Sequence, residues 1–261
     1  VRVLGVCFDS CGVSPRTWET INSALERQVA VAEKFALSLR YRAYLVKAVS
    51  CGQRFYAAHV GLPPPRFCRR VTTCLFRFYW SHGTELVTRA VLRLSTSLGG
   101  RRMPCVDTMS RVLALRTILG VLDDTEHPAR CLALYFLGPS RRRLVPRALG
   151  NRYPSAEITP PFYQTVVSFQ EDLRRVVQDL MVRDEPPARI VEEVCLTQIT
   201  ADERVGANAF SWDSLVSRCL PEPVEDLEWR QGWEVLPTRD RLQLWGMVPD
   251  SRCPNCGEVE T

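Results

Sequence analysis

Prolines divide this chain into short segments, and their positions limit the folds that it can adopt. They cluster at residues 63–65, 160–161 and 186–187, and they recur at 221, 223 and 237. Because proline lacks a backbone N–H and clashes with the preceding turn, it ends a helix or occupies its first turn. Between the prolines, apolar residues recur mostly at spacings of three and four. The sequence therefore predicts a mainly α fold.

This periodicity predicts where the helices lie. They are expected at residues 17–40, 42–60, 66–80, 108–122, 160–183, 188–196, 221–235 and 238–245. Val1 to Phe8 is a β-branched, apolar run, which predicts a single N-terminal strand. Residues 97–104, which contain Gly99 and Gly100, predict a flexible basic loop. The pattern at 132–137 leaves the type of structure open.

Charge is distributed unevenly along the chain. Residues 1–150 carry a formal balance of +14 and residues 151–261 one of −9, so the overall +5 conceals two opposite halves. The only lysines are Lys34 and Lys47, and every other cation is arginine. The planar guanidinium fork suits phosphate, although a compositional bias of the coding DNA would also enrich arginine. The first half is therefore the part expected to bind a polyanion.

Several classes of protein are disfavoured by the sequence. It contains no run of 18 apolar residues and no secretory signal pattern, so neither a membrane partner nor secretion is expected. The eleven cysteines are mostly single among apolar residues, which predicts reduced thiols and an intracellular location, in the nucleus or the cytoplasm.

The basic helices are the main functional candidates. Cations spaced along helices can follow a phosphate backbone. Eight candidates lie in the first three predicted helices: Lys34, Arg40, Arg42, Lys47, Arg66, Arg69, Arg70 and Arg77. The aromatic residues between them are expected in the core, with base stacking by Phe67 or Tyr79 as the alternative.

Two further basic segments are candidates for contacts with nucleic acid. Arg101 and Arg102 lie in the predicted loop. Arg141, Arg142 and Arg143 form a run that could contact phosphate, act as a nuclear-import patch or simply face solvent.

No catalytic centre is predicted. Asp123-Asp124 is the only adjacent aspartate pair, but it closes a predicted helix, where such residues usually form solvated turns. Cys68 and Cys74 have no nearby activating histidine. The chain itself is therefore not expected to be an enzyme.

Cys253 and Cys256 form a C-x-x-C pair near the C-terminal end. Two thiolates on one tight turn can occupy two corners of a zinc tetrahedron, but two further ligands are needed. The pair is thus an incomplete half-site, and no cofactor is expected in this chain. A preceding group of apolar residues predicts a small helical core that supports it: Leu227, Trp229, Trp233, Leu236, Leu242, Leu244 and Trp245.

The order of several motifs resembles the region after the palm of LINE-type (non-long-terminal-repeat) retrotransposon reverse transcriptases. The matching segments are residues 3–6 (VLGV), 42–49 (RAYLVKAV), 76–80 (FRFYW), 98–104 (LGGRRMP), 233–242 (WEVLPTRDRL), 245–248 (WGMV) and 253–257 (CPNCG). Tyr41 stands where the family often has glycine. The resemblance implies a polymerase palm before Val1, and a histidine and a cysteine after Thr261 that complete a Cys-Cys-His-Cys zinc site in the parent polyprotein.

The resemblance also implies the organisation and the role of the chain. Residues 1–100 would be the end of the palm and a helical thumb-like domain, 101–158 a basic connector, and 159–261 a helical segment leading into a truncated zinc module. RNA and RNA–DNA duplex are the expected partners, together with target DNA and the rest of the polyprotein. The chain would position template and primer. The alternative is an arginine-rich helical scaffold that binds other proteins, and a third, weaker one is an intact polymerase.

Overall fold

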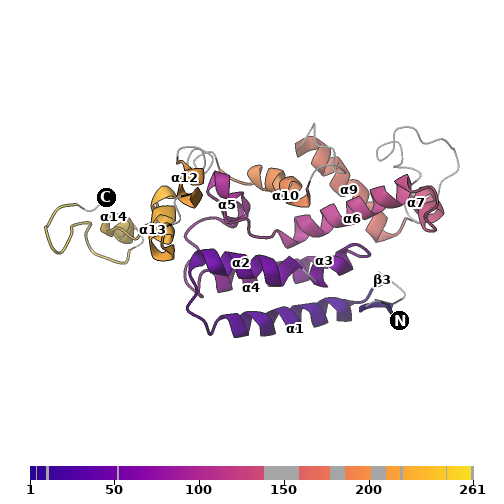
Figure 1. The fold of residues 1–261 in the computed structure, drawn as a ribbon, viewed down its shortest axis with the longest axis horizontal. Coiled ribbons are helices and arrows are strands. Elements are labelled where there is room, and N and C mark those ends of the chain that lie inside the picture. Colours follow the sequence, from indigo (N-terminus) through magenta and orange to yellow (C-terminus); the bar gives the residue numbers. More distant parts are fainter. Residues whose placement is uncertain are drawn as a thin grey trace.

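The computed structural model is mainly α, which confirms the predicted fold class (Figure 1). It describes residues 1–3, 5–9, 12–51, 53–137, 159–176, 186–200, 210–217, 220–244 and 246–259. Within these ranges a small antiparallel sheet has the order β1-β2-β3, and all other regular elements are helical. None of the helices in these ranges combines the length and the apolar character that crossing a bilayer requires.

The elements follow one another along the chain. The strands are β1 (Arg2–Val3), β2 (Val6–Asp9) and β3 (Gly12–Val13). The first helices are α1 (Pro15–Ala32), α2 (Leu39–Cys51), α3 (Gln53–Ala58), α4 (Pro65–Tyr79) and α5 (Arg89–Arg93), followed by the 3₁₀ helix η1 (Thr96–Leu98). The later helices are α6 (Val106–Asp123), α7 (Arg130–Phe136), α9 (Pro161–Val176), α10 (Pro187–Leu196), α12 (Trp212–Ser217), α13 (Glu222–Gly232) and α14 (Arg239–Leu244).

The prediction of a single N-terminal strand is wrong. The run folds into a hairpin in which Val3 pairs with Val6 and Arg2 with Cys7. Gly5 makes the turn possible because its φ of +86° lies in the left-handed region, which glycine adopts without a steric penalty. A second antiparallel pairing joins β2 to β3, and the Thr17 hydroxyl of α1 hydrogen-bonds both the N–H and the carbonyl of Cys7. The small sheet is therefore fixed to the start of α1.

The predicted helix 17–40 is in fact two helices. The chain leaves the helical path after Ala32, and α2 begins at Leu39. The Leu39 N–H donates to Asp226 Oδ2 at 2.9 Å, so a carboxylate from α13 satisfies one of the free donors at the start of α2. This contact joins residues that are 187 positions apart, and a local pattern cannot predict it.

The helices form two main layers with a short cluster at one end (Figure 1). α1 and α2 both pack on α4, while α6 contacts α3, α4, α9 and α10. One core lies among α1, α2 and α4, and it also contains Trp212, Leu215 and Trp229 from the C-terminal helices. A second core joins α6, α7, α9 and α10. Buried side chains therefore connect the predicted regions 1–100 and 159–261.

α4 matches its predicted position and has two distinct faces. Its buried face contains Val71, Leu75 and Phe76, each at most 1 % exposed. Phe67 and Tyr79 are buried as well, so these aromatic residues belong to the core as predicted. The arginines point outward from the opposite face.

The segment predicted as a flexible basic loop is instead a packed connection. The carbonyl oxygen of Gly99 accepts hydrogen bonds from the indole N–H groups of Trp229 and Trp233, at 2.8 and 2.9 Å. Gly99 has a φ of +76°, and a Cβ at this position would lie 2.5 Å from the Trp212 ring. Three tryptophans from α12, α13 and the residue after α13 thus close over the loop.

The prediction of a separate small core near the C-terminal end is also wrong. Trp229 and Trp233 join the first core, whereas Leu227 and Leu244 are 53 % and 78 % exposed. Trp245 lies outside the described residues.

Candidate nucleic-acid interface

A groove between α1 and α4 brings together three of the predicted cations. Its volume is about 470 Å³. Arg69, Arg70 and Arg77 line it from α4, and Glu26 and Glu33 line it from α1 and the residue that follows it. Val29, Thr73, Cys74 and His82 complete the lining. The groove therefore has three arginines on its α4 side and two carboxylates on its α1 side.

The exposed face of α4 carries four arginines in one stripe. Arg66, Arg69, Arg70 and Arg77 are all exposed. Their spacing of three, four and seven residues places them on one side of a helix. At a rise of 1.5 Å per residue the stripe is about 16 Å long. We name Arg66, Arg69, Arg70 and Arg77 the α4 stripe.

The polar contacts in the groove are exposed. Arg70 Nη2 lies 2.8 Å from Glu26 Oε1, and the two side chains are 66 % and 40 % exposed. His82 Nε2 lies 2.9 Å from Glu33 Oε1, and His82 Nδ1 lies 3.4 Å from Arg77 Nη2. Exposed pairs of this kind contribute about 0–1 kcal/mol, so a phosphate can replace either carboxylate at little cost.

Three other predicted cations have structural roles. Arg101 is 6 % exposed, and its Nη1 lies 2.8 Å from Glu225 Oε1 and its Nη2 3.3 Å from Asp226 Oδ1. Arg40 Nη1 lies 2.6 Å from Glu225 Oε2. Arg42 donates to the backbone carbonyls of Leu37 and Phe78. We correct the assignment of Arg101 to nucleic acid, because its guanidinium faces carboxylates inside the protein.

Burial and neighbouring arginines have opposite effects on the pKa values of Glu225 and Asp226. Burial alone would raise the pKa of Glu225, but the hydrogen bonds and the charges of Arg101 and Arg40 together outweigh burial and hold that pKa below its ordinary value of 4.5. Burial raises the pKa of Asp226 despite the hydrogen bond from the Leu39 N–H. The hydrogen bond and the charge of Glu225 raise the pKa of Arg40, which keeps that guanidinium charged.

The remaining predicted cations lie elsewhere. Lys34 is exposed in the turn after α1, and Lys47 is half-buried on α2. Arg102 is exposed with a φ of 52°. Arg141, Arg142 and Arg143 lie outside the described residues.

Comparison of this sequence with protein-family models and with curated proteins finds no match.

Three groove residues were not identified from the sequence. His82, Glu26 and Glu33 belong to no motif that points to nucleic acid. Ser81 and His82, with φ values of 52° and 63°, form the turn that follows α4. This turn folds His82 back onto Arg77, and Glu33 reaches it from α1.

Cys253 and Cys256 lie on a tight turn. The Cys253 N–H donates to the Glu258 carbonyl at 2.7 Å, and the Gly257 N–H donates to the Cys253 carbonyl at 2.8 Å. A bridge between Arg252 and Val259 closes the turn. Within the described residues no group of three or more histidine, cysteine, aspartate or glutamate side chains is placed to hold a metal ion. Cys253 and Cys256 therefore share one turn, and a zinc site there needs two further ligands.

Asp124 forms a turn, as predicted. Its Oδ1 accepts a hydrogen bond from the Glu126 N–H at 3.0 Å, and both aspartates of the pair are exposed at the end of α6. This is the geometry of a turn former.

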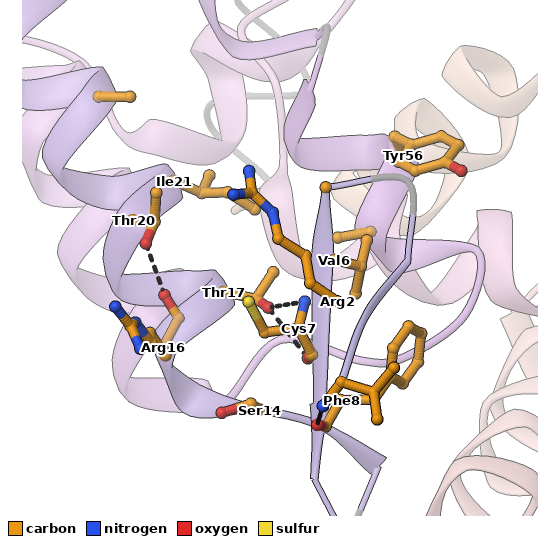
Figure 2. A pocket seen from close by; sticks show the side chains of 14 residues that line it. Arg2, Val6, Cys7, Phe8, Ser14, Arg16, Thr17, Thr20, Ile21 and Tyr56 are labelled. Carbon is orange, nitrogen blue, oxygen red and sulfur yellow. Dashed lines mark hydrogen bonds between the residues drawn. The ribbon is translucent and has the colours of Figure 1, made fainter.

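A larger cavity lies between the N-terminal sheet and α1 (Figure 2). Its volume is about 720 Å³. Arg2, Arg16, Thr17 and Tyr56 are among the residues that line it, whereas none of the cations predicted from the sequence does. Of the two hollows, only the α1–α4 groove is lined by predicted cations, which are Arg69, Arg70 and Arg77.

Proposed function

We propose that the α1–α4 groove and the α4 stripe bind the phosphate backbone of a nucleic-acid duplex, with RNA–DNA duplex as the preferred form. The observation that supports this most strongly is the α4 stripe. Its four arginines are exposed and lie on one face of α4, and three of them, Arg69, Arg70 and Arg77, line the groove. The chain would hold and position template and primer, and it would not catalyse polymerisation.

The length of the stripe suits a backbone. Base pairs in a duplex follow one another at about 3.4 Å, so about 16 Å of helix spans roughly five base steps. Each guanidinium can donate two parallel hydrogen bonds to one phosphate. Contacts of this kind recognise charge and shape rather than sequence.

The carboxylates of the groove oppose this function only weakly. Glu26 and Glu33 are 40 % and 36 % exposed in their side chains, so neither is held in place by burial. A phosphate that approaches Arg70 would compete with Glu26 for the same donors. Glu26 is therefore expected to reduce affinity without preventing binding.

The resemblance to LINE-type reverse transcriptases supports the choice of ligand. In that family the segment after the palm is the thumb, which implies an RNA–DNA duplex as the partner here. The same resemblance leads us to propose that the chemistry belongs to another part of a parent polymerase, and that the C-terminal segment helps to engage RNA or target DNA.

The alternative is an arginine-rich scaffold that binds other proteins. It is favoured by the internal roles of Arg40, Arg42 and Arg101, which show that arginine also serves the fold in this chain. The two functions differ in their response to salt, because contacts with phosphate release counterions and contacts with a protein surface release few.

The test is a titration of labelled RNA–DNA duplex at several salt concentrations, read by fluorescence anisotropy. If four phosphates are neutralised, the logarithm of the binding constant should fall with the logarithm of salt with a slope of about −3.6. The triple variant R66Q/R69Q/R77Q should weaken binding and reduce that slope by about three. E26Q should strengthen binding, because it removes a negative charge that competes for Arg70.

The single variant R69Q should also weaken binding, and its matched control is R175Q on α9. Arg175 is 79 % exposed and lies outside the groove, so the same loss of one charge should change binding far less. A binding constant that does not change with salt concentration would favour the scaffold. Equal losses of affinity in R175Q and R69Q would favour it too. DNA synthesis by this chain in a primer-extension assay would contradict the proposal that it binds the duplex without catalysing polymerisation.

A further inference from the structure

His82 lies in the groove between α1 and α4, and both of its ring nitrogens have a partner. Its Nε2 lies 2.9 Å from Glu33 Oε1, and its Nδ1 lies 3.4 Å from Arg77 Nη2. The His82 and Glu33 side chains are 51 % and 36 % exposed, so protons and solutes reach both of them from solvent. The imidazole therefore connects a carboxylate at the end of α1 to a guanidinium of the α4 stripe.

The backbone holds this ring at the C-terminal end of α4. Ser81 and His82 both have left-handed φ values, 52° and 63°, which few residues other than glycine adopt. The His82 N–H donates to the Arg77 carbonyl at 2.8 Å, and the Ser81 N–H donates to the Phe78 carbonyl at 3.2 Å. Hydrogen bonds of this kind end many helices. Here they turn the chain back over the last turn of α4 and bring His82 beside the Arg77 side chain.

The chemistry of the two partners determines the protonation state of the ring. A guanidinium has only hydrogen-bond donors, and a carboxylate has only acceptors. Nδ1 can therefore contact Arg77 only as an unprotonated acceptor, while Nε2 carries the hydrogen that it donates to Glu33. This is the arrangement of a neutral imidazole with its hydrogen on Nε2.

A second proton on the ring changes both the charge and the contacts of the groove. With neutral His82, the arginines and carboxylates of the lining give a formal charge of +1, and the imidazolium raises it to +2. The added hydrogen on Nδ1 faces the Arg77 guanidinium, and two donors of like charge cannot share a hydrogen bond. Arg77 then has to turn away from the ring. Its N–H groups and the Nδ1–H both become available to an acceptor in the groove.

We propose that protonated His82 is a further phosphate-binding residue of the α1–α4 groove, and that its protonation releases Arg77 to bind phosphate as well. This inference rests on the function proposed for the groove, and it adds control of the affinity by pH. Histidine is the side chain whose charge ordinarily changes between about pH 5 and 8. The affinity for duplex should therefore be highest at the acidic end of this range and fall as the pH rises and the imidazole loses its proton.

The groups around His82 have opposite effects on the imidazolium. Glu33 stabilises it, and so does the C-terminal end of α4, which carries a partial negative charge. Arg77 opposes it. The other ionisable groups of the groove lining are Glu26, Arg69, Arg70 and Cys74. A phosphate in the groove adds negative charge beside the ring, so phosphate binding and protonation of His82 favour each other.

The first test measures duplex binding by fluorescence anisotropy at two pH values. The RNA–DNA duplex carries no terminal phosphate, because a terminal phosphate itself titrates near pH 6. From about pH 8 to about pH 5.5, the affinity of the wild-type chain should rise about three- to ten-fold. H82N should remove most of this rise, since asparagine is uncharged and readily adopts a left-handed φ. The matched control is H127N, which should keep the rise because His127 does not line the groove.

The second test uses the free protein and depends on no nucleic acid. Nitrogen NMR shifts of the His82 ring, assigned by their loss in H82N, should show an unprotonated Nδ1 and a protonated Nε2 at about pH 8. A hydrogen on Nδ1 at that pH would overturn the proposal, because Arg77 would then have no acceptor to release.

The outcomes separate this inference from the function on which it rests. Duplex binding that falls with salt and is weakened by R66Q/R69Q/R77Q would support the function of the groove. If the wild type and H82N then respond equally to pH, the proposed role of His82 alone is refuted. If the chain binds no duplex at either pH, the proposed function is refuted and this inference with it.

Discussion

Replacing Arg101 by methionine should destabilise the protein strongly, even though the substituted residue is not part of the proposed interface. The Arg101, Glu225 and Asp226 side chains are only 7 %, 4 % and 13 % exposed. Loss of the guanidinium leaves Asp226 without its nearest cation and leaves Glu225 with Arg40 alone. Methionine retains the apolar stem, so the change tests charge more than packing.

The magnitude follows from the contacts. Removing one partner of a buried ion pair costs about 3–5 kcal/mol, and the remaining Arg40 contact places this case near 3. Arg101 also lies 4.8 Å from the centroid of the Trp229 ring, and loss of that cation–π contact adds about 1 kcal/mol. We expect R101M to lose about 4 kcal/mol of unfolding free energy, measured by urea denaturation with far-UV circular dichroism.

Two comparisons make this prediction specific. The triple variant R101M/E225Q/D226N should recover more than half of the loss, because it no longer buries uncompensated charge. R175Q should change stability little, since Arg175 is 79 % exposed. A loss below about 1 kcal/mol for R101M, or no recovery in the triple variant, would refute the assignment of Arg101 to an internal ion network.

Further predictions concern the same region. G99A should cost about 2–4 kcal/mol in urea denaturation, because alanine is strained at a φ of +76° and its Cβ would lie 2.5 Å from the Trp212 ring. G120A on α6, where an added Cβ meets nothing within 4 Å, should instead stabilise by about 0.5–1 kcal/mol. The lowered pKa of Glu225 predicts a contribution to stability that is complete above the ordinary pKa of 4.5 and is lost as the pH falls through the folded-state value. E225Q should therefore show a smaller decline of the urea midpoint between neutral and acidic pH, and an unchanged decline would contradict the role of this carboxylate.

Local sequence patterns predict well those helices whose position depends only on residues within the helix. α4 begins after a run of prolines and alternates arginines with a continuous apolar face, so its position and its buried aromatic residues follow from the sequence. α6 was likewise predicted within two residues at each end. In both cases the apolar period of the segment is enough, because neighbouring elements only have to cover that face.

The features that were missed depend on distant residues. α2 starts at Leu39 because Asp226 accepts its N–H, and residues 97–104 are ordered by tryptophans from the C-terminal helices. No property of residues 33–38 or 97–104 alone indicates these partners. Sequence patterns describe what a segment prefers, whereas tertiary contacts of this range decide where it ends.

The same distinction between local spacing and distant contacts applies to the predicted cations. The α4 stripe was predicted because its arginines are spaced along one helix. Arg40, Arg42 and Arg101 were grouped with it by charge, but Glu225 and backbone carbonyls engage them. Charge indicates that a cation is present, and only the fold shows whether its partner is solvent or a carboxylate.

The most direct test of the account is a map of arginine reactivity with phenylglyoxal, read by mass spectrometry with and without RNA–DNA duplex. Free protein should react at the α4 stripe and at Arg175, and Arg101 should stay unreactive because it is buried. Added duplex should protect the α4 stripe and leave Arg175 reactive. A stripe that reacts equally with and without bound duplex, or protection that is greatest at Arg175, would contradict a duplex held at the α1–α4 groove.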